Sequence, residues 1–238
     1  ERAMAYLFDR YRPHLYGFKL RIGKDISEGM GLRPLEESVK LARKYRTRLS
    51  LHATYPLEPM PEIVDRLGRG DVLCHTFQAK GPYSIFPEVW SARERGVLFD
   101  SAQGRIHCSF PVARAAIEQG FPPDVISTDL ITFSVYQERL FSLPVTMSRF
   151  LALDMSLYDV VRRVTAVPAS LMGLGGEIGT LRPGALADVA VMKLEERKFD
   201  FQDSYGNSLP ASALLLPQMT LKAGRCCWRN TAFTAFCR

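Results

Sequence analysis

The sequence predicts an α/β fold in which short parallel strands alternate with helices, as in a (β/α)8 TIM-type barrel. Short apolar runs recur along the first 130 residues, and continuous apolar runs are typical of strands buried on both faces. Helical patterns separate these runs. Four runs end in residues that can carry chemistry: Lys19, His52, His75 and Asp129. Because barrel active sites lie at the carboxyl ends of the strands, we expect these four side chains to form one site.

The expected strands cover residues 16–22, 49–52, 72–75, 96–100 and 125–129. A turn at Gly70-Asp71 precedes the third strand. Each interval leaves room for the dozen or more residues that a parallel crossover needs. This spacing favours βα units, although a single histidine after a strand is more often a surface or core residue than a ligand.

Apolar residues at helical spacing predict helices over about 1–11, 34–46, 61–67, 86–95, 145–153 and 157–167, and one more between Ser109 and Gly120. Ser156, with Asp159 three residues later, resembles a capping box at the last of these. Residues 23–31 are expected to be a loop that overhangs the site.

The pattern changes near residue 174, where glycines become frequent. Residues 187–194 and 219–222 are predicted strands, and Ala223-Gly224 is a predicted turn. We therefore divide the chain into a partial barrel over 1–173 and a smaller β portion with a tail over 174–238. A length of 238 residues allows one main domain and a smaller second one.

Composition excludes several classes of protein. A hydrophobic content of 47% and a charged content of 24% are those of an ordinary globular protein. The net charge is +6, but lysines and arginines are scattered, which argues against nucleic-acid binding. No apolar run approaches the roughly 18 residues of a membrane span. Five cysteines without a CxxC pair favour a reducing, cytoplasmic compartment over a disulfide framework. A homo-oligomer remains open.

Two histidines and a carboxylate suit Zn²⁺ and similar divalent ions. A lysine joins such a set if it is desolvated and neutral, because the amine can then react with carbon dioxide to form an anionic carbamate that bridges two ions. Two ions roughly 3.5–4 Å apart can share a hydroxide and polarise a carbonyl. Asp129 would then hold one ion and accept the proton of the attacking water.

The chain resembles the amidohydrolase superfamily, in particular its dihydroorotase-like and deacetylase-like metallohydrolases. The matching segments are residues 17–21, 51–52, 70–77, 95–100 and 123–129, and residues 184–189 look like the return into a β-sandwich portion. The resemblance covers about residues 10–228.

This resemblance implies a metal-dependent hydrolase of amide, cyclic amide or ester bonds in a small molecule, with two zinc ions. It implies that Lys19 is the carboxylated bridge, that His52 and His75 bind the second metal, and that Asp129 is a ligand of the first metal and the general base. The candidate substrate-binding residues are Arg21 and Lys80, at matching family positions, and Gln103 and His107, in a loop.

The chain departs from this family in lacking the His-x-His pair of the first strand. On this resemblance the sequence starts just before the fourth strand and contains about strands 4–8, fewer residues than the roughly 250 of a complete barrel. We therefore expect a longer protein, and we expect the 238 residues alone to be inactive. Two alternatives remain open: an aldolase that uses Lys19 as a Schiff-base nucleophile, and a non-catalytic relative.

Overall fold

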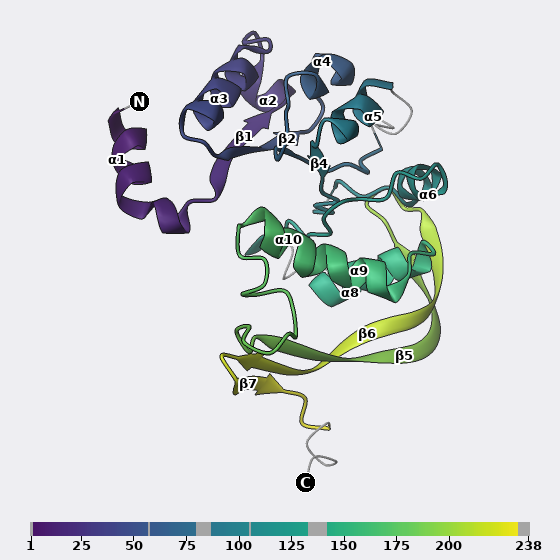
Figure 1. Ribbon diagram of the computed structural model, residues 1–238. Helices are drawn as coiled ribbons and strands as arrows, with labels where there is room; N and C mark the ends of the chain where they lie inside the picture. Colours follow the sequence, from purple (N-terminus) through teal and green to yellow (C-terminus); the bar gives the residue numbers. More distant parts are fainter. Residues whose placement is uncertain (1, 57, 80–86, 105, 133–141, 233–238) are drawn as a thin grey trace.

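The structure is a computed structural model that describes residues 2–56, 58–79, 87–104, 106–132 and 142–232. It contains a four-stranded parallel sheet and a three-stranded antiparallel sheet, with helices packed around the first and between the two (Figure 1). In the described part of the chain, no helix is long and apolar enough to cross a membrane.

The parallel sheet consists of β1 (Gly17–Ile22), β2 (Arg48–Ala53), β3 (Val72–Cys74) and β4 (Leu98–Phe99). The strands pair in sequence order, and every pair is parallel. This arrangement confirms the predicted α/β class with consecutive βα units. Because all four strands run in the same direction, the residues at their carboxyl ends lie at the same end of the sheet, here called its carboxyl edge.

The fifth apolar run, residues 125–129, does not form a regular strand. Val125 makes a single parallel bridge to Asp100. The backbone amides of Ser101, Gln103 and Gly104 then donate to the carbonyls of residues 125, 127 and 128 at 2.8 to 3.3 Å. Ala102 has a φ of 33°, which lies outside the β region and interrupts the ladder. The run therefore extends the sheet in the predicted direction without strand geometry.

The described helices lie close to the predicted positions: α1 (Arg2–Tyr11), α3 (Arg33–Lys44), α4 (Met60–Val64), α5 (Pro87–Glu94), α6 (Phe110–Glu118), α8 (Leu143–Ala152), α9 (Leu157–Val164) and α10 (Ala166–Leu171). The short helices η1 (Arg12–His14) and α2 (Lys24–Ser27) were not expected; α2 falls in the predicted 23–31 loop. The Ser156 hydroxyl accepts from the Asp159 amide, as the capping pattern predicted.

The single helix predicted over 157–167 is wrong, because α9 and α10 are separate helices. Pro168 explains the break. Proline has no N–H to donate to the carbonyl of Val164, four residues earlier, and its ring crowds that carbonyl.

The antiparallel sheet contains β5 (Val189–Gln202), β6 (Ser208–Lys222) and β7 (Arg225–Arg229) in that order. The predicted strands, 187–194 and 219–222, are too short, since β5 and β6 form one long hairpin. Pro210 and Pro217 argued against a strand over the length of β6, because proline within a sheet is usually confined to edge strands or bulges. Pro217 indeed lies at an irregularity in the β5–β6 register.

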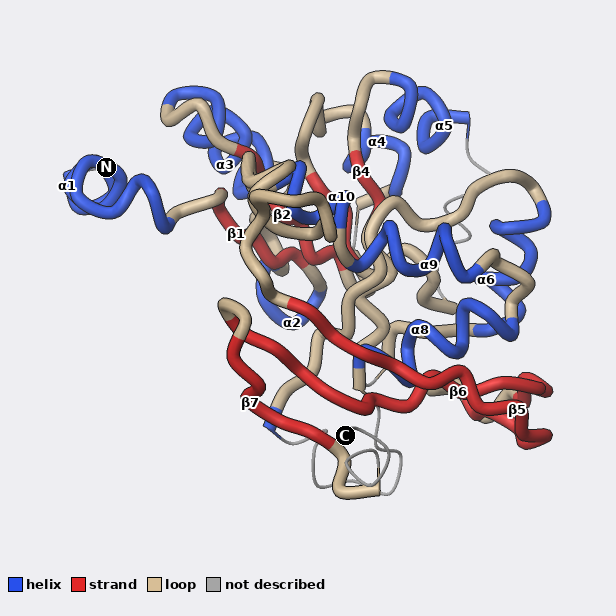
Figure 2. The backbone as a smooth tube through the Cα atoms, turned by 60° about the horizontal axis from the view of Figure 1, so that its bottom comes forward, coloured by secondary structure: helices blue, strands red, loops and turns tan. Residues whose placement is uncertain are grey.

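The long hairpin curves beneath the helical layer, and α8 lies directly against β6 (Figures 1 and 2). The amide of Leu215 donates to the Ser148 hydroxyl at 2.9 Å. Leu209 and Leu215 of β6 belong to the same buried cluster as Phe150 of α8. The predicted boundary after residue 173 thus follows α10, while the apolar core continues across it.

Candidate metal centre

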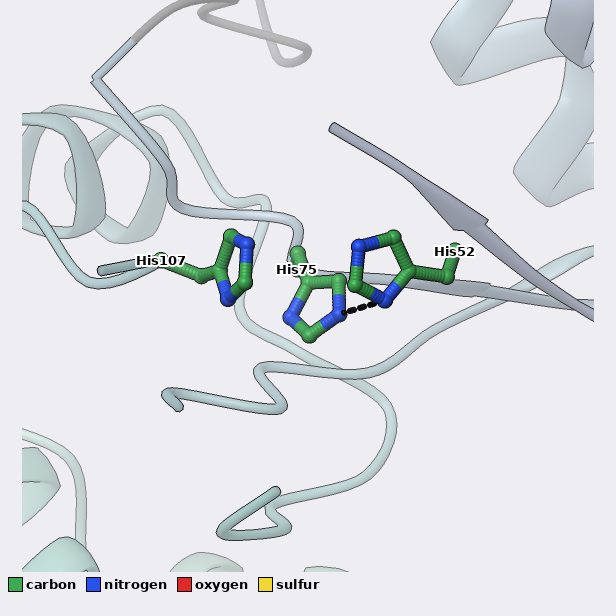
Figure 3. Close-up of side chains that lie close together, drawn as sticks. All are labelled: His52, His75 and His107. Atoms are coloured by element: carbon green, nitrogen blue, oxygen red, sulfur yellow. Dashed lines mark hydrogen bonds between the residues drawn. The ribbon is translucent and has the colours of Figure 1, made fainter. Parts of the chain in front are cut away.

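Two imidazoles from neighbouring strands face each other at the carboxyl edge of the parallel sheet. His52 belongs to β2 and His75 directly follows β3, and Nδ1 of His52 lies 2.8 Å from Nε2 of His75 (Figure 3). Alternation along a regular strand would send His75 to the face opposite Cys74. The backbone of His75 instead has a φ of 64°, which turns its side chain toward His52. Such conformations are uncommon in non-glycine residues and cluster at functional sites.

His107 adds a third imidazole from the loop that precedes α6. Its ring stacks on that of His75, with centroids 3.8 Å apart and planes 30° apart (Figure 3). All three histidines are buried, and one nitrogen from each lies within 4.8 Å of the others. Sequence analysis treated His107 as a substrate contact, but this geometry also makes it a candidate ligand.

Two further groups fix the orientation of these rings. Nδ1 of His75 donates to the carbonyl of Ala102 at 2.7 Å. The Thr54 hydroxyl lies between Nε2 of His52, at 2.8 Å, and Nε2 of His107, at 3.0 Å. Hydrogen bonds of this kind to the second ring atom orient metal-binding histidines in proteins. Thr54 carried no signal in the sequence.

Burial keeps the three imidazoles neutral. It lowers the pKa of His52 to about 3 and the pKa values of His75 and His107 to about 4, from an ordinary value of 6.5. The neighbouring imidazole of His75 adds to the effect at His52 and at His107. Because a metal binds only the neutral imidazole, all three rings are in the required state at neutral pH.

Asp129 and Lys19 also lie near this cluster. Oδ2 of Asp129 lies 3.9 Å from Nε2 of His75, and the φ of Asp129 is 48°. Nζ of Lys19 donates to Sγ of Cys74 at 3.9 Å. Lys19 is exposed among the described residues, so the desolvation that a carbamate requires is not met by them alone. Its strand, β1, is an edge strand of the described sheet, so no further strand covers it.

A cavity of about 990 Å³ opens at this edge of the sheet. Its lining includes five candidates from the sequence, together with residues of α2 and the adjoining loops: Lys19, Arg21, His52, Asp129, His107, Thr54, Tyr55, Lys24, Asp25, Glu28, Ile106 and Ile131. Arg21 also forms an ion pair with Asp25 at 3.0 Å. The cavity therefore places a cation, a carboxylate and imidazoles around one space.

One predicted substrate contact, Gln103, is not among the described residues that line this cavity. The expectation for Gln103 is not supported, because its side chain is buried and its Oε1 accepts from Nη1 of Arg149 at 2.9 Å. A buried guanidinium needs hydrogen-bond acceptors, and the side-chain oxygen of Gln103 is one of those that Arg149 uses. Lys80 lies outside the described residues.

Gly104 and Asp100 support the site without having been predicted. A Cβ at position 104 would lie 2.8 Å from Nδ1 of His107 and 3.0 Å from Oδ2 of Asp129, so a side chain there would have to displace one of these two groups. Asp100 accepts from the Ser127 hydroxyl at 2.7 Å and from the Ala102 amide at 3.1 Å. Burial raises the pKa of Asp100 to about 6.

These residues fit a divalent metal ion. A neutral His75 whose Nδ1 carries a proton for Ala102 must present a lone pair at Nε2, and this lone pair points at Nδ1 of His52. Imidazole nitrogens and a carboxylate are the donors that zinc and related ions prefer.

Comparisons with known proteins identify a matching family. Residues 33–224 match the family described as "Amidohydrolase family". A deacetylase of Brucella anthropi is 32% identical over 211 residues, which are 86% of this chain and 52% of that protein. The chain thus spans about half the length of this curated relative.

Two solved structures have the same fold. The crystal structure of an adenine deaminase has a TM-score of 0.86 and 25% identity, covering 96% of this chain and 63% of the other. That of a dihydroorotase has a TM-score of 0.85 and 28% identity, covering 94% and 60%.

Proposed function

The chain belongs to the amidohydrolase family, and we propose that the protein containing it is a metal-dependent hydrolase of amide, cyclic amide or ester bonds. The observation that carries this proposal is the group of three buried, neutral imidazoles next to Asp129 at an open cavity. The similarity to a deacetylase and to a dihydroorotase supports carbon–nitrogen bonds as the principal target.

We propose that His52 and His75 hold one divalent ion, and that Asp129 contributes to a second, with zinc as the metal. Lys19 lines the same cavity as His52 and Asp129, which supports Lys19 as a bridge between the two ions. Its carboxylation requires that another part of the full-length protein cover Lys19, which is exposed on the edge strand β1. A bound ion of this kind acts as a Lewis acid toward a carbonyl and lowers the pKa of water. His107 lies within reach of the same ions or of the substrate.

Asp129 acts in this proposal as the general base. Its carboxylate is partly exposed, at 39%, and borders the cavity, so it can reach a water molecule there. It would accept a proton from the attacking water and return it to the leaving nitrogen or oxygen. Arg21 borders the same cavity and would bind an anionic group of a small-molecule substrate.

The aldolase alternative is less well supported, because a Schiff base on Lys19 leaves three clustered imidazoles without a role. A non-catalytic relative would have no need of the open cavity. The inactivity of the isolated 238 residues, a cytoplasmic location and a homo-oligomer remain predictions.

The test uses the full-length protein that contains this chain. We expect bound zinc by mass spectrometry, and turnover of at least one of an N-acetylated amine, a cyclic amide and an acetate ester. A chelator should abolish that turnover and added zinc should restore it. Turnover that persists without metal would refute the proposal.

Asp129→Asn should retain most of the metal and lower turnover about 10²–10⁴-fold, the usual contribution of a general base. Asp154→Asn is the matched control, since Asp154 is an exposed aspartate that also has a positive φ, of 65°. Equal turnover in the two variants would reassign the base.

A further inference from the structure

The β5–β6 hairpin ends in a turn of residues 203–207, the hairpin tip, which lies against the backbone that carries His107. Three hydrogen bonds join the two segments. The Tyr205 hydroxyl donates to the carbonyl of Ile106 at 2.8 Å, and the Ser204 amide donates to the carbonyl of Cys108 at 3.4 Å. The Phe110 amide donates to Oδ2 of Asp203 at 2.8 Å. His107 is therefore held from both sides by residues almost one hundred positions later.

The hairpin tip is itself well fixed. Asp203 is buried, and its Oδ1 accepts from the amides of Tyr205, at 2.8 Å, and Asn207, at 2.9 Å. Its Oδ2 accepts from the Asn207 side chain at 2.8 Å, in addition to the bond from Phe110. A carboxylate bonded in this way closes the turn and provides a rigid support for Tyr205.

Tyr205 also contacts the loop that follows His75. Its hydroxyl oxygen accepts from the amide of Ala79 at 3.1 Å while its proton goes to Ile106. One hydroxyl thus links the loop that follows His75 to the residue that precedes His107. It also interacts with Tyr55, which lines the cavity.

His107 gains from this support, because its ring stacks on His75 but makes only one hydrogen bond among the described residues. Nε2 is bonded to Thr54, whereas Nδ1 is buried and has no hydrogen-bond partner among the described residues. The loop before it is irregular, with positive φ at Ala102 and Gly104. The position of the ring therefore depends on the backbone of residues 106–110.

We propose that Tyr205 is a positioning residue for the metal centre: the hairpin tip of the C-terminal sheet holds the 106–110 backbone and so places His107 beside His52 and His75. This inference rests on the proposed function only in taking the imidazole cluster to be a metal site. It gives the C-terminal sheet a role in the chemistry of a site formed otherwise by the parallel sheet.

The first experiment is a double-mutant cycle on zinc affinity in the full-length protein, measured by competition with a chelator. Tyr205→Phe keeps the ring and removes the hydroxyl, and should weaken zinc binding about three- to tenfold, the range expected for one hydrogen bond. In a His107→Ala background the same change should have no further effect. Tyr158→Phe is the control, since Tyr158 is 75% exposed on α9.

Unchanged affinity in Tyr205→Phe, or an equal loss in both backgrounds, would overturn the proposal. The second experiment, hydrogen–deuterium exchange, does not need metal. The amides of Ala79 and Phe110 should exchange faster in Tyr205→Phe than in wild type or Tyr158→Phe. If the wild type binds no zinc, the proposed function fails and exchange alone decides the positioning role; unchanged exchange would reject it.

Discussion

Nε2 of His75 lies 2.8 Å from Nδ1 of His52, while Nδ1 of His75 is bonded to the carbonyl of Ala102. A carbonyl only accepts, so neutral His75 keeps its proton on Nδ1 and turns a lone pair toward His52. Either a proton on Nδ1 of His52 or a bound cation must therefore lie between Nδ1 of His52 and Nε2 of His75. The two rings are therefore placed so that one cation could be bound by both.

This pair leads to the first prediction. His75→Ala removes the fully buried member and should lower the zinc content of the full-length protein by at least one ion per chain, because His52 alone cannot hold it. The measurement is mass spectrometry of metal after equilibrium dialysis. His14→Ala, on the exposed histidine of η1, should retain the wild-type content. Wild-type zinc in His75→Ala would exclude His75 as a ligand.

The second prediction concerns the pH dependence of stability without metal. Burial lowers the pKa values of His52, His75 and His107 to about 3–4, so between about pH 4 and 6.5 the unfolded chain takes up protons that the folded chain excludes. Stability should therefore fall as the pH drops through this window. Asp100 acts in the opposite direction, since burial raises its pKa to about 6, but three imidazoles outweigh one carboxyl.

The measurement is the melting temperature of chelator-treated protein at pH 7.0, 5.5 and 4.5. His107→Gln removes one of the three groups and should make the dependence shallower, whereas His14→Ala should leave it unchanged. A melting temperature that stays constant or rises on acidification would contradict this account.

Much of the site could be predicted because its residues end apolar runs. A buried parallel strand has a clear apolar signature, and its last residues reach the carboxyl edge, which is why the sequence places His52 there. Asp129 borders the same cavity although its apolar run forms no regular strand. The approach of His107 could not be predicted, because it depends on the path of an irregular loop with positive φ at Ala102 and Gly104. Thr54 was likewise missed, since its bridging position exists only after both rings are placed.

The same distinction applies to the fold. Parallel order and helix positions follow from periodicity, while the length of β6 and the break before α10 do not. Both errors involve proline. Pro217 is accommodated in β6 at an irregularity of the β5–β6 register. Pro168 separates α9 from α10, although the apolar spacing of the sequence continues across the break. Local sequence does not reveal whether the surrounding structure accommodates a proline or breaks at it.

The third prediction concerns Thr54, whose hydroxyl joins His52 to His107. Thr54→Val keeps the branched shape and removes the hydroxyl, so both rings lose a shared orienting partner. Zinc affinity should fall about 10-fold or more, as is typical of such supporting groups. Thr47→Val, at the opposite end of β2, is the matched control and should bind zinc like the wild type. Equal affinities in both variants would show that Thr54 does not orient the rings.

The last prediction uses the tight fit around Gly104. Gly104→Ala has two costs: an alanine at a φ of 51°, and a methyl group 2.8 Å from Nδ1 of His107 and 3.0 Å from Oδ2 of Asp129. Gly31→Ala isolates the first cost, because its φ is 57° and its nearest neighbour lies 4.0 Å away. The backbone cost is about 1–2 kcal/mol in each variant.

Both variants should therefore lose a similar amount of thermal stability from the backbone, but only Gly104→Ala should also lose zinc affinity and turnover. The methyl group can be accommodated only if the His107 ring or the Asp129 carboxylate moves, and either movement disrupts the arrangement around His75. Melting curves, zinc titration and turnover of the two proteins side by side separate the two costs. If Gly104→Ala binds zinc and turns over like Gly31→Ala, the close approach of His107 and Asp129 is not required for the site.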